Sequence, residues 1–373
     1  MTRLLLIGGG HAHVRVLEKL ARQRPTDLEV TLVTPYERQL YSGMLPGWIA
    51  GHYGRIDELA IPLAPLAARA RVRLRLARVT SLDLEANIAY TDRGDELRFD
   101  LASIAAGPAT RLESIAGAID FGVPLRPIEH FVETWQQQYL AMLGHPSGST
   151  RVSFIGGGAG GVELALATAW RLRKMESAVR VQLITGGSLL PGFPEAARKL
   201  VAETLAAAQV RIVPHLATRI ERGLIGLEDG SQIASDISIL TTGAAPEDWL
   251  RYSGLATDEA GFVAVNAYQQ SISHPQVFAA GDCASQIDHP RPRSGVYAVR
   301  AGAPLARNLL AAASGRPLKA WRPQRRALYL LSAGAYRAIG VWGPLVFEGE
   351  WVWRWKQHID RRFIRRYTLA EPE

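Results

Sequence analysis

Cys283 is the residue with the widest choice of chemical roles. It is the only cysteine among 373 residues and stands directly after Asp282 in the stretch VFAAGDCA. A single thiol cannot form an intramolecular disulfide or a multi-cysteine metal site. Its open roles are nucleophile, partner thiol or buried spectator. The sequence predicts a helix start here, and the positive end of a helix could activate the thiol. The alternative is a small residue that packs behind a turn.

Two glycine-rich turns could hold phosphates. The second has the complete pattern G-x-G-x-x-G, whereas the first has His13 in place of the third glycine. Such glycines allow a tight turn, approach of the backbone to a pyrophosphate, and close packing of helix on strand. The helix start adds free N–H groups and a positive dipole end. His13 predicts a wider helix–strand crossing in the first copy. The glycines are Gly8 and Gly10 in the first turn, and Gly156, Gly158 and Gly161 in the second.

These turns belong to an internal repeat. RLLLIGGGHAHVRVLEKL at 3–20 and RVSFIGGGAGGVELALAT at 151–168 each consist of an apolar strand, three glycines and an amphipathic run. A second strand follows each, VTLVT at 30–34 and VQLIT at 181–185. A β-rich stretch with a polar turn and an apolar strand ending in AAG or TTG then follow in both copies. The pattern predicts two βαβ nucleotide-binding units.

Composition narrows the class of protein. The length and the 47% hydrophobic content are typical of two or three domains with sizeable cores. The apolar stretch at the start of the chain, LLLI before the glycines, is too short for a signal peptide. No apolar run in the sequence has the length of a membrane span. A single cysteine is typical of a cytoplasmic protein. Residues 316–373 contain 12 of the 43 basic and 5 of the 35 acidic residues, so they carry seven of the eight net positive charges.

The ordered motifs resemble those of the two-dinucleotide-binding flavoproteins, which include the pyridine nucleotide–disulfide oxidoreductases and the type II NADH dehydrogenases. The resemblance rests on the two glycine turns, on Ala106-Gly107, on Thr242-Gly243 and on VFAAGD. The stretches GGGHAH and YSGMLPGWIAGHY and the tail also resemble a subgroup known as single chains and as N-terminal fusions to selenide, water dikinase. The resemblance implies an α/β fold with two Rossmann-like domains, glutathione-reductase-like, followed by a basic aromatic tail.

The resemblance also implies the domain plan and the cofactors. FAD is expected in a discontinuous domain of residues 1–109 plus 262–320, and NAD(P)H in a domain of residues 110–261. Residues 321–373 form a C-terminal region, a candidate membrane or dimer element. The Asp282 carboxylate is expected to bind the ribityl chain of FAD, which favours the spectator role for Cys283. The expected cofactor-binding residues are Gly8, Gly10, Thr34, Pro35, Pro46, Val79, Ala106, Gly107, Gly156, Gly158, Gly161, Gly243, Asp282 and Val296.

Disulfide reductases of this superfamily have two redox cysteines after the second strand, but this chain has RQLYSGMLPGWIAG at 38–51. Exchange through an internal cysteine pair is therefore excluded by composition. Type II NADH dehydrogenases have an apolar segment here, so Met44, Leu45 and Pro46 are candidates to line the flavin; the alternative is a plain turn. Glu163 is the candidate catalytic residue, either positioning the nicotinamide or relaying a proton, unless it is only a carboxylate favoured by the helix dipole. A helix from Ser294 is expected to point its N-terminus at the flavin.

The sequence departs from the family pattern at the ribose-binding position, and it contains three histidines that raise the question of a metal site. Each second strand should end in an acid that binds a ribose hydroxyl, but the strands end in Thr34-Pro35 and Thr185-Gly186. The choice between NADH and NADPH is therefore open. His11, His13 and His52 could suggest a metal site, but a single His-x-His is weak, and we expect no metal.

The tail EWVWRWKQHIDRRFIRRYTL from Glu350 predicts an amphipathic helix. Trp351, Trp355, Ile359 and Phe363 recur every four residues and drift about 40° per step. An aromatic stripe with an arginine-rich face suits a helix in a membrane interface, which would place the protein on the cytoplasmic face of the inner membrane. The alternative is packing on the flavin domain or on a second subunit. The arginines are Arg354, Arg361, Arg362, Arg365 and Arg366.

Three functions are open. The favoured one is an NAD(P)H dehydrogenase with FAD that reduces a quinone or another small acceptor without redox cysteines. The second is a redox module of selenium metabolism, suggested by the fusion resemblance. The third is a non-catalytic dinucleotide-binding sensor, suggested by the missing acids. The expected partners are a nicotinamide nucleotide and a small electron acceptor, with a membrane surface or a second copy as candidates and no nucleic acid.

Overall fold

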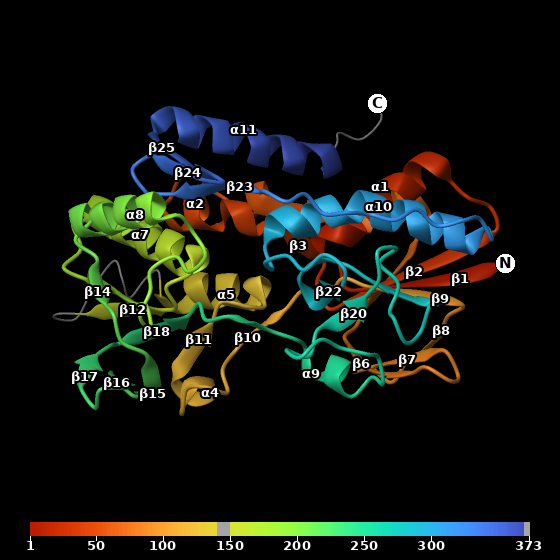
Figure 1. Cartoon of the computed structure of the whole chain (residues 1–373), viewed down its shortest axis with the longest axis horizontal. Coiled ribbons are helices and arrows are strands. Elements are labelled where there is room, and N and C mark those ends of the chain that lie inside the picture. The colour runs from red at the N-terminus through yellow and green to blue at the C-terminus, as the bar shows by residue number, and fades with distance from the viewer. Residues whose placement is uncertain (140–149, 369–373) are drawn as a thin grey trace.

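Two five-stranded parallel sheets form the two halves of the molecule in this computed structural model, which describes residues 1–139 and 150–368 (Figure 1). The sheet orders are β21-β9-β1-β2-β5 and β11-β18-β12-β13-β14. Residues 140–149, in the expected nicotinamide domain, and 369–373, in the expected C-terminal region, lie outside the described residues. The strands are Val277–Ala279 (β21), Leu101–Ile104 (β9), Thr2–Ile7 (β1), Leu28–Thr34 (β2), Arg73–Leu76 (β5), Gly122–Pro124 (β11), Ile237–Leu240 (β18), Arg151–Ile155 (β12), Arg180–Ile184 (β13) and Arg211–Val213 (β14).

The predicted βαβ units are confirmed. Helix α1 (His11–Gln23) follows β1, and helix α7 (Ala159–Lys174) follows β12. In each unit the chain returns to pair parallel with the strand it left, β2 with β1 and β13 with β12. Because a helix that follows a parallel strand starts at its carboxyl end, both helix N-termini lie at the ligand-binding edge of their sheets.

Successive side chains of each strand point to opposite faces of the sheet, and this divides the apolar core into two layers. In β1, Leu4 and Leu6 belong to the apolar core on the helix side of the sheet, while Leu5 and Ile7 belong to a second core on the other side. The helix-side core is continuous across both units. Strands buried on both faces in this way are typical of parallel sheets covered on both sides.

Two small antiparallel sheets cover the faces opposite the helices. One consists of β6 (Val79–Asp83), β7 (Ile88–Thr91) and β8 (Glu96–Arg98). The other consists of β15 (Ala217–Glu221), β16 (Leu224–Leu227) and β17 (Gln232–Ala234). Their polar turns lie where the repeat predicts them, between β7 and β8 and between β16 and β17.

The first sheet takes its edge strand from far along the chain. Strand β21 pairs with β9, so Val277 lies opposite Ala102. The second unit is therefore inserted between strands of the first sheet, which supports the discontinuous division that we propose, 1–109 plus 262–320 around 110–261. Helix α10 (Gly295–Ala313) then packs beside α1, and its start after Ser294 agrees with the prediction.

One predicted helix is absent. Asp282 and Cys283 lie in a single 3-10 turn, Gly281–Cys283, which leads into strand β22 (Ala284–Gln286). The expected helix start at Cys283 is therefore wrong, and no helix dipole activates the thiol there. The longer helix begins only at Gly295, after a proline-rich loop.

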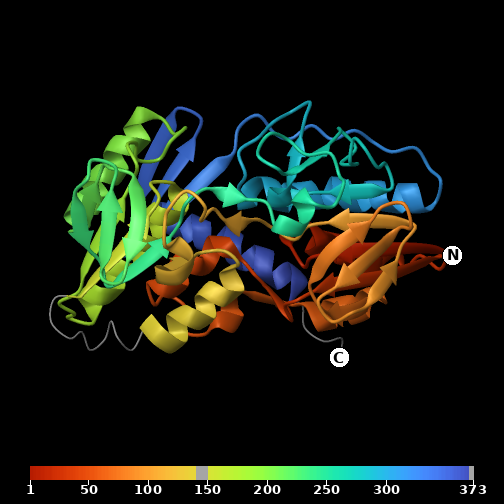
Figure 2. The same cartoon turned by 90° about the horizontal axis from the view of Figure 1, so that it is seen from below.

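The tail forms an antiparallel sheet and a long helix. Strands β23 (Leu328–Ser332), β24 (Ala338–Trp342) and β25 (Leu345–Gly349) lead into helix α11 (Glu350–Tyr367). Figures 1 and 2 show α11 lying across the helix side of both units. At its end Arg366 pairs with Glu18 of α1 at 3.0 Å.

The predicted stripe on α11 is divided between two surfaces. Trp351, Trp355 and Ile359 are exposed, at 57%, 40% and 38%. Phe363 instead packs inward and stacks on Tyr41 with ring centroids 4.5 Å apart. Three steps of about 40° turn the stripe through about 120°, so its last member lies against the protein.

The remaining elements are short connections and caps. They comprise helices α2 (Leu45–Ile49), α3 (Leu63–Ala70), α4 (Ala118–Phe121), α5 (Ile128–Thr134), α8 (Glu195–Ala207) and α9 (Asp248–Arg251), the 3-10 helices Ser42–Met44 and Ile56–Leu59, a π-helical turn at Trp135–Tyr139, and strands β3 (Arg38–Leu40), β4 (Ala60–Pro62), β10 (Ala109–Thr110), β19 (Ala244–Ala245) and β20 (Val263–Val265).

Candidate functional site

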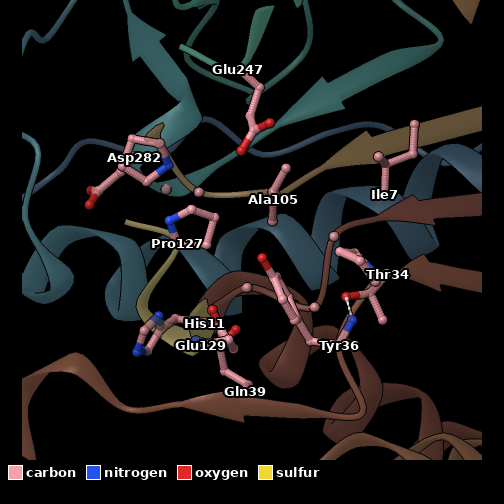
Figure 3. A pocket seen from close by; sticks show the side chains of 18 of the residues that line it. Ile7, His11, Thr34, Tyr36, Gln39, Ala105, Pro127, Glu129, Glu247 and Asp282 are labelled. Carbon is pink, nitrogen blue, oxygen red and sulfur yellow. Dashed lines mark hydrogen bonds between the residues drawn. The ribbon is translucent and has the colours of Figure 1, made fainter. Parts of the chain in front are cut away.

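A cleft of about 1220 Å³, including its open mouth, lies at the carboxyl ends of the first sheet (Figure 3). It runs past the first glycine turn, the end of β2, the start of β6, the segment after β9 and the 3-10 turn at Gly281. Eight of the predicted cofactor-binding residues meet here although they come from five separate stretches of sequence. They are Gly8, Gly10, Thr34, Pro35, Val79, Ala106, Gly107 and Asp282.

The first glycine turn is shaped by close backbone approach. A Cβ on Gly8, whose φ is +90°, would lie 2.5 Å from the Ala106 Cα, and one on Gly10 would overlap the Ala105 carbonyl oxygen. This approach places the start of α1 at the cleft, where the His11 and Ala12 amides have no place in the helix hydrogen-bond ladder. Free amides at a helix N-terminus fit a pyrophosphate.

His13 replaces the third glycine by filling the helix–strand contact. Its ring nitrogens lie 2.6 Å from the Gly8 carbonyl oxygen and 2.9 Å from the Ser103 hydroxyl, and burial lowers its pKa to about 4. At the matching position of the second unit, a Cβ on Gly161 would clash with the Gly156 carbonyl oxygen. In the first unit, the His13 ring occupies the space between helix and sheet and hydrogen-bonds on both sides.

Asp282 projects into the cleft from the 3-10 turn (Figure 3). No described residue hydrogen-bonds its carboxylate. Burial raises its pKa, while the positive charges of Arg126 and Arg293 act in the opposite direction. A partly buried carboxylate without a protein donor fits a ligand that brings hydroxyl groups, as a ribityl chain does.

Several residues of the cleft were not predicted. Tyr36 and Gln39 come from the segment after β2, and Glu129 and Glu247 come from stretches near the junctions between the two units (Figure 3). Burial raises the pKa of both glutamates. They are carboxylates in a cleft whose β2 lacks the usual ribose-binding acid. A sequence pattern could not have found them, because they reach the cleft only through the folded arrangement of the two units.

Four residues that were predicted to contact the flavin do not line this cleft. Met44, Leu45 and Pro46 are buried, and the cleft is lined instead by Ser42. Val296 lies in the first turn of α10, where Gly295 and Ala298 line the cleft. A flavin contact of these four residues stays a prediction.

The second glycine turn has the same backbone geometry in the other unit. Gly156, with φ of +131°, lies so close to β18 that a Cβ would be 2.6 Å from the Thr241 carbonyl oxygen. Gly158 differs, because no protein atom lies within 4 Å of a Cβ built there. Its glycine is not required by packing, and this open space at the start of α7 fits a pyrophosphate approaching the backbone. Gly243 is likewise open.

Glu163 lies one turn into α7 and faces the tail sheet. Its Oε1 accepts a hydrogen bond from the Ser332 amide at 2.7 Å. Burial raises its pKa to about 7, and the positive charge of Lys356 on α11 acts against that rise. A carboxyl that titrates near neutrality is suited to acid–base work.

Cys283 is unsuited to nucleophilic chemistry. It is fully buried, and its Sγ lies 3.4 Å from the carbonyl oxygens of Ile104 and Ala280. Burial raises its pKa to about 12. The thiol packs behind the turn that presents Asp282, which agrees with the spectator interpretation.

The three histidines have separate environments. His11 lines the cleft, His13 is enclosed under α1, and His52 stacks on Tyr336 with ring centroids 4.2 Å apart. Within residues 1–139 and 150–368, no group of three or more His, Cys, Asp or Glu side chains could hold a metal ion.

Comparison with known proteins shows the family. Residues 2–302 match the family model described as pyridine nucleotide-disulphide oxidoreductase. The chain belongs to this family. The pyridine nucleotide-disulphide oxidoreductases use FAD and NAD(P)H, so this chain is an oxidoreductase with those cofactors. The expected α/β fold with two Rossmann-like units is confirmed.

Several known proteins are similar to this chain over most of their length. An NADH dehydrogenase-like protein, YutJ of Bacillus subtilis, is 28% identical over 76% of this chain and 77% of its own. The demethylphylloquinone reductase NdbB of Synechocystis is 27% identical over 86% and 82%. Among solved structures, NDH2 of Plasmodium falciparum in complex with NADH has a TM-score of 0.81 at 13% identity, covering 100% of this chain and 99% of its own.

The residues around the cleft predict different outcomes for two adjacent substitutions. Asp282→Ala removes the acceptor for cofactor hydroxyls, which contributes about 1.5–3 kcal/mol, and should weaken FAD retention about ten-fold or more. Cys283→Ala should leave the flavin content unchanged. In the folded wild type Cys283 should resist alkylation at pH 8, because its pKa of about 12 leaves almost no thiolate. Flavin absorbance after gel filtration and mass spectrometry of the alkylated chain measure both; the opposite ranking would contradict these roles.

Two substitutions in the second glycine turn form a matched pair that separates ligand binding from packing. Gly158→Ala should keep the melting temperature of the wild type and weaken NAD(P)H binding, because only a ligand approaches that position. Gly161→Ala should lower the melting temperature as well, because its Cβ meets the Gly156 carbonyl oxygen. Differential scanning fluorimetry and nucleotide titration separate the two effects. Unchanged NAD(P)H affinity in Gly158→Ala would contradict the assignment.

Proposed function

We propose that this oxidoreductase passes a hydride from NAD(P)H to FAD and then two electrons to a small quinone acceptor. The observation that carries the proposal is the absence of a redox cysteine beside the flavin cleft. The only thiol of the chain is buried, and its pKa is raised to about 12. Reducing equivalents must therefore leave the flavin for an external acceptor. Relatives named as demethylphylloquinone reductase and NAD(P)H-ubiquinone oxidoreductase support a quinone.

The protein's part in this reaction is binding and orientation, since FAD supplies the two-electron chemistry when it is bound. The amides at the start of α1 and the Asp282 carboxylate would hold the pyrophosphate and ribityl chain. The turn at Gly158 would hold the nucleotide. Gly295 brings the N-terminus of α10 to the same cleft. A helix terminus favours a nearby anion by about 0.3–2 kcal/mol, so it could tune a two-electron couple by tens of millivolts.

An anaerobic titration tests the function. The purified protein should be yellow, NADH or NADPH should bleach it, and a water-soluble quinone should restore the colour. The nucleotide that bleaches at the lower concentration is the preferred donor. If neither nucleotide reduces the flavin, the proposal is wrong. If the flavin is reduced but no quinone reoxidises it, the acceptor is of another class, and the selenium-linked function should be tested next.

The tail carries a surface suited to a membrane interface. Trp351 and Trp355 stack parallel on the outside of α11, and Phe347 of β25 stacks against both. Trp342 and Leu345 at the β24–β25 turn are 49% and 57% exposed. No helix among the described residues is long and apolar enough to cross a bilayer. The surface therefore supports peripheral attachment, which we propose to occur at the cytoplasmic face of the inner membrane, where a lipid-soluble quinone would be within reach.

Basic residues accompany this surface. Arg354, Arg361, Arg362 and Arg365 are exposed on the same helix. Each basic side chain near anionic lipid contributes about 1 kcal/mol, so four could hold the protein reversibly. The competing occupant of the surface is a second copy of the chain, which would give a homodimer.

Flotation with anionic liposomes distinguishes these occupants. The wild type should float at low salt, and the double variant Trp351→Ser/Trp355→Ser should remain in the bottom fraction with its flavin bound. Tyr252→Ser is the matched control, because Tyr252 is 87% exposed and directly follows α9. Figure 1 shows α9 on the side of the molecule opposite α11. If the wild type fails to float and light scattering gives a dimer that the double variant loses, the surface is a subunit interface.

A further inference from the structure

Strand β2 ends without the acid that usually accepts hydrogen bonds from a ribose. Thr34 stands in its place, with a side chain that is 1% exposed and a hydroxyl oxygen that accepts a hydrogen bond from the Tyr36 amide at 3.4 Å. A hydroxyl is also a weaker acceptor than a carboxylate. The nearest acid along the chain, Glu37, is exposed and does not line the cleft. The segment after β2 therefore supplies no carboxylate for a ribose.

Three acidic side chains of the described chain do line the cleft. Asp282 lies on the 3-10 turn, at the end where the ribityl chain is expected. Glu129 already accepts hydrogen bonds from the Leu40 amide and from its own amide. The third is Glu247, and no described residue hydrogen-bonds its carboxylate. Of the three, Glu247 is the one that has neither a backbone donor nor an expected place at the ribityl chain.

Glu247 reaches the end of β2 from the second unit. It follows strand β19 in the stretch 110–261, and its side chain points into the cleft (Figure 3). Its Oε2 lies 3.6 Å from the Nη1 of Arg78. Arg78 belongs to the first unit and stands beside β2, because the preceding Ala77 amide donates to the Thr34 carbonyl oxygen at 3.1 Å. The Glu247 carboxylate is thus held close to the place of the missing acid.

The ion pair with Arg78 does not by itself explain an enclosed glutamate here. The Glu247 side chain is 19% exposed, whereas that of Arg78 is 41% exposed. A pair of this length with one solvated member contributes little to stability. An ionised carboxylate has about four acceptor positions, so Glu247 keeps free positions for ligand donors. Two neighbouring hydroxyl groups, as on a ribose, match such an acceptor.

We propose that Glu247 replaces the missing acid of β2 and accepts hydrogen bonds from the adenosine ribose hydroxyls of FAD. The ribose carboxylate then comes from the second unit, whereas in the usual pattern it comes from the strand beside the glycine turn. FAD binding therefore ties the two units together at the adenosine end of the cleft. This inference rests on FAD as the cofactor of the proposed function and is independent of the electron acceptor.

The central variant is Glu247→Met, which keeps the length of the side chain and removes the acceptor. The flavin-free full-length protein is titrated with FAD and with FAD that contains 2′-deoxyadenosine, and flavin fluorescence reports binding. The wild type should bind the deoxy flavin about ten-fold more weakly or worse, because a hydrogen bond to a carboxylate is lost. Glu247→Met should bind FAD more weakly by a similar factor and should bind the two flavins equally. This double comparison isolates the contact between carboxylate and hydroxyl.

Two further variants serve as controls. Arg78→Met removes the ion pair but leaves the carboxylate, so it should retain the preference for FAD over the deoxy flavin. Glu37→Gln changes an exposed acid outside the cleft and should behave as the wild type. The melting temperature of the flavin-free Glu247→Met should stay within about 2 °C of the wild type, because the pair contributes little to stability.

The outcomes separate this inference from the proposed function. Equal binding of both flavins by the wild type, or a full preference for FAD in Glu247→Met, would overturn the role of Glu247. Equal loss of the preference in Glu247→Met and Arg78→Met would assign the effect to the ion pair and would also overturn it. Lack of quinone turnover would contradict the proposed function alone, because the flavin titration needs neither NAD(P)H nor a quinone.

Discussion

Close contact between a glycine turn and the neighbouring strand is the constraint on which both halves of this molecule depend. A Cβ on Gly10 would overlap the Ala105 carbonyl oxygen, and a Cβ on Gly156 would lie 2.6 Å from the Thr241 carbonyl oxygen. That contact pulls the start of a helix to the edge of its sheet, and the free amides there then face outward into the ligand site. The rest of each unit supports this contact between turn and strand. Apolar side chains pack on both faces of the parallel strands, and a small antiparallel sheet covers the face opposite the helices.

The contact occurs in both units, but the two copies differ in how the helix is held against the sheet. In the first, His13 bridges helix and strand through Gly8 and Ser103, so the helix is held by side-chain hydrogen bonds as well as by backbone proximity. In the second, Gly158 stands in open space that the protein does not fill. A repeat of one plan thus yields one turn braced by a histidine at the first cleft and one turn with open space beside its second glycine.

The repeat could be predicted because its signals are local: strand, glycines and helix follow within twenty residues, and the spacing of Gly156, Gly158 and Gly161 is itself the motif. The cleft could be predicted only where such motifs reach it. Glu129 and Glu247 were not predicted, because they lie in segments that connect the two units. The position of those segments depends on how the units pack together. The helix expected at Cys283 was wrong for a related reason, since a proline-rich loop delays the helix to Gly295. The aromatic and apolar residues of the α11 stripe were identified from the sequence. The 40° drift per step then decides which of these residues face outward in the folded protein.

Helix α11 has two faces of different character, an exposed aromatic face and an enclosed charged face. Its outer face presents Trp351 and Trp355, and its inner face places the Lys356–Asp360 pair against the turn at Gly43. Because one rigid helix carries both faces, a force that moves the outer face must also move the enclosed pair. Helix α11 is therefore packed into the body of the molecule through its enclosed charges while its aromatic residues stay on the surface.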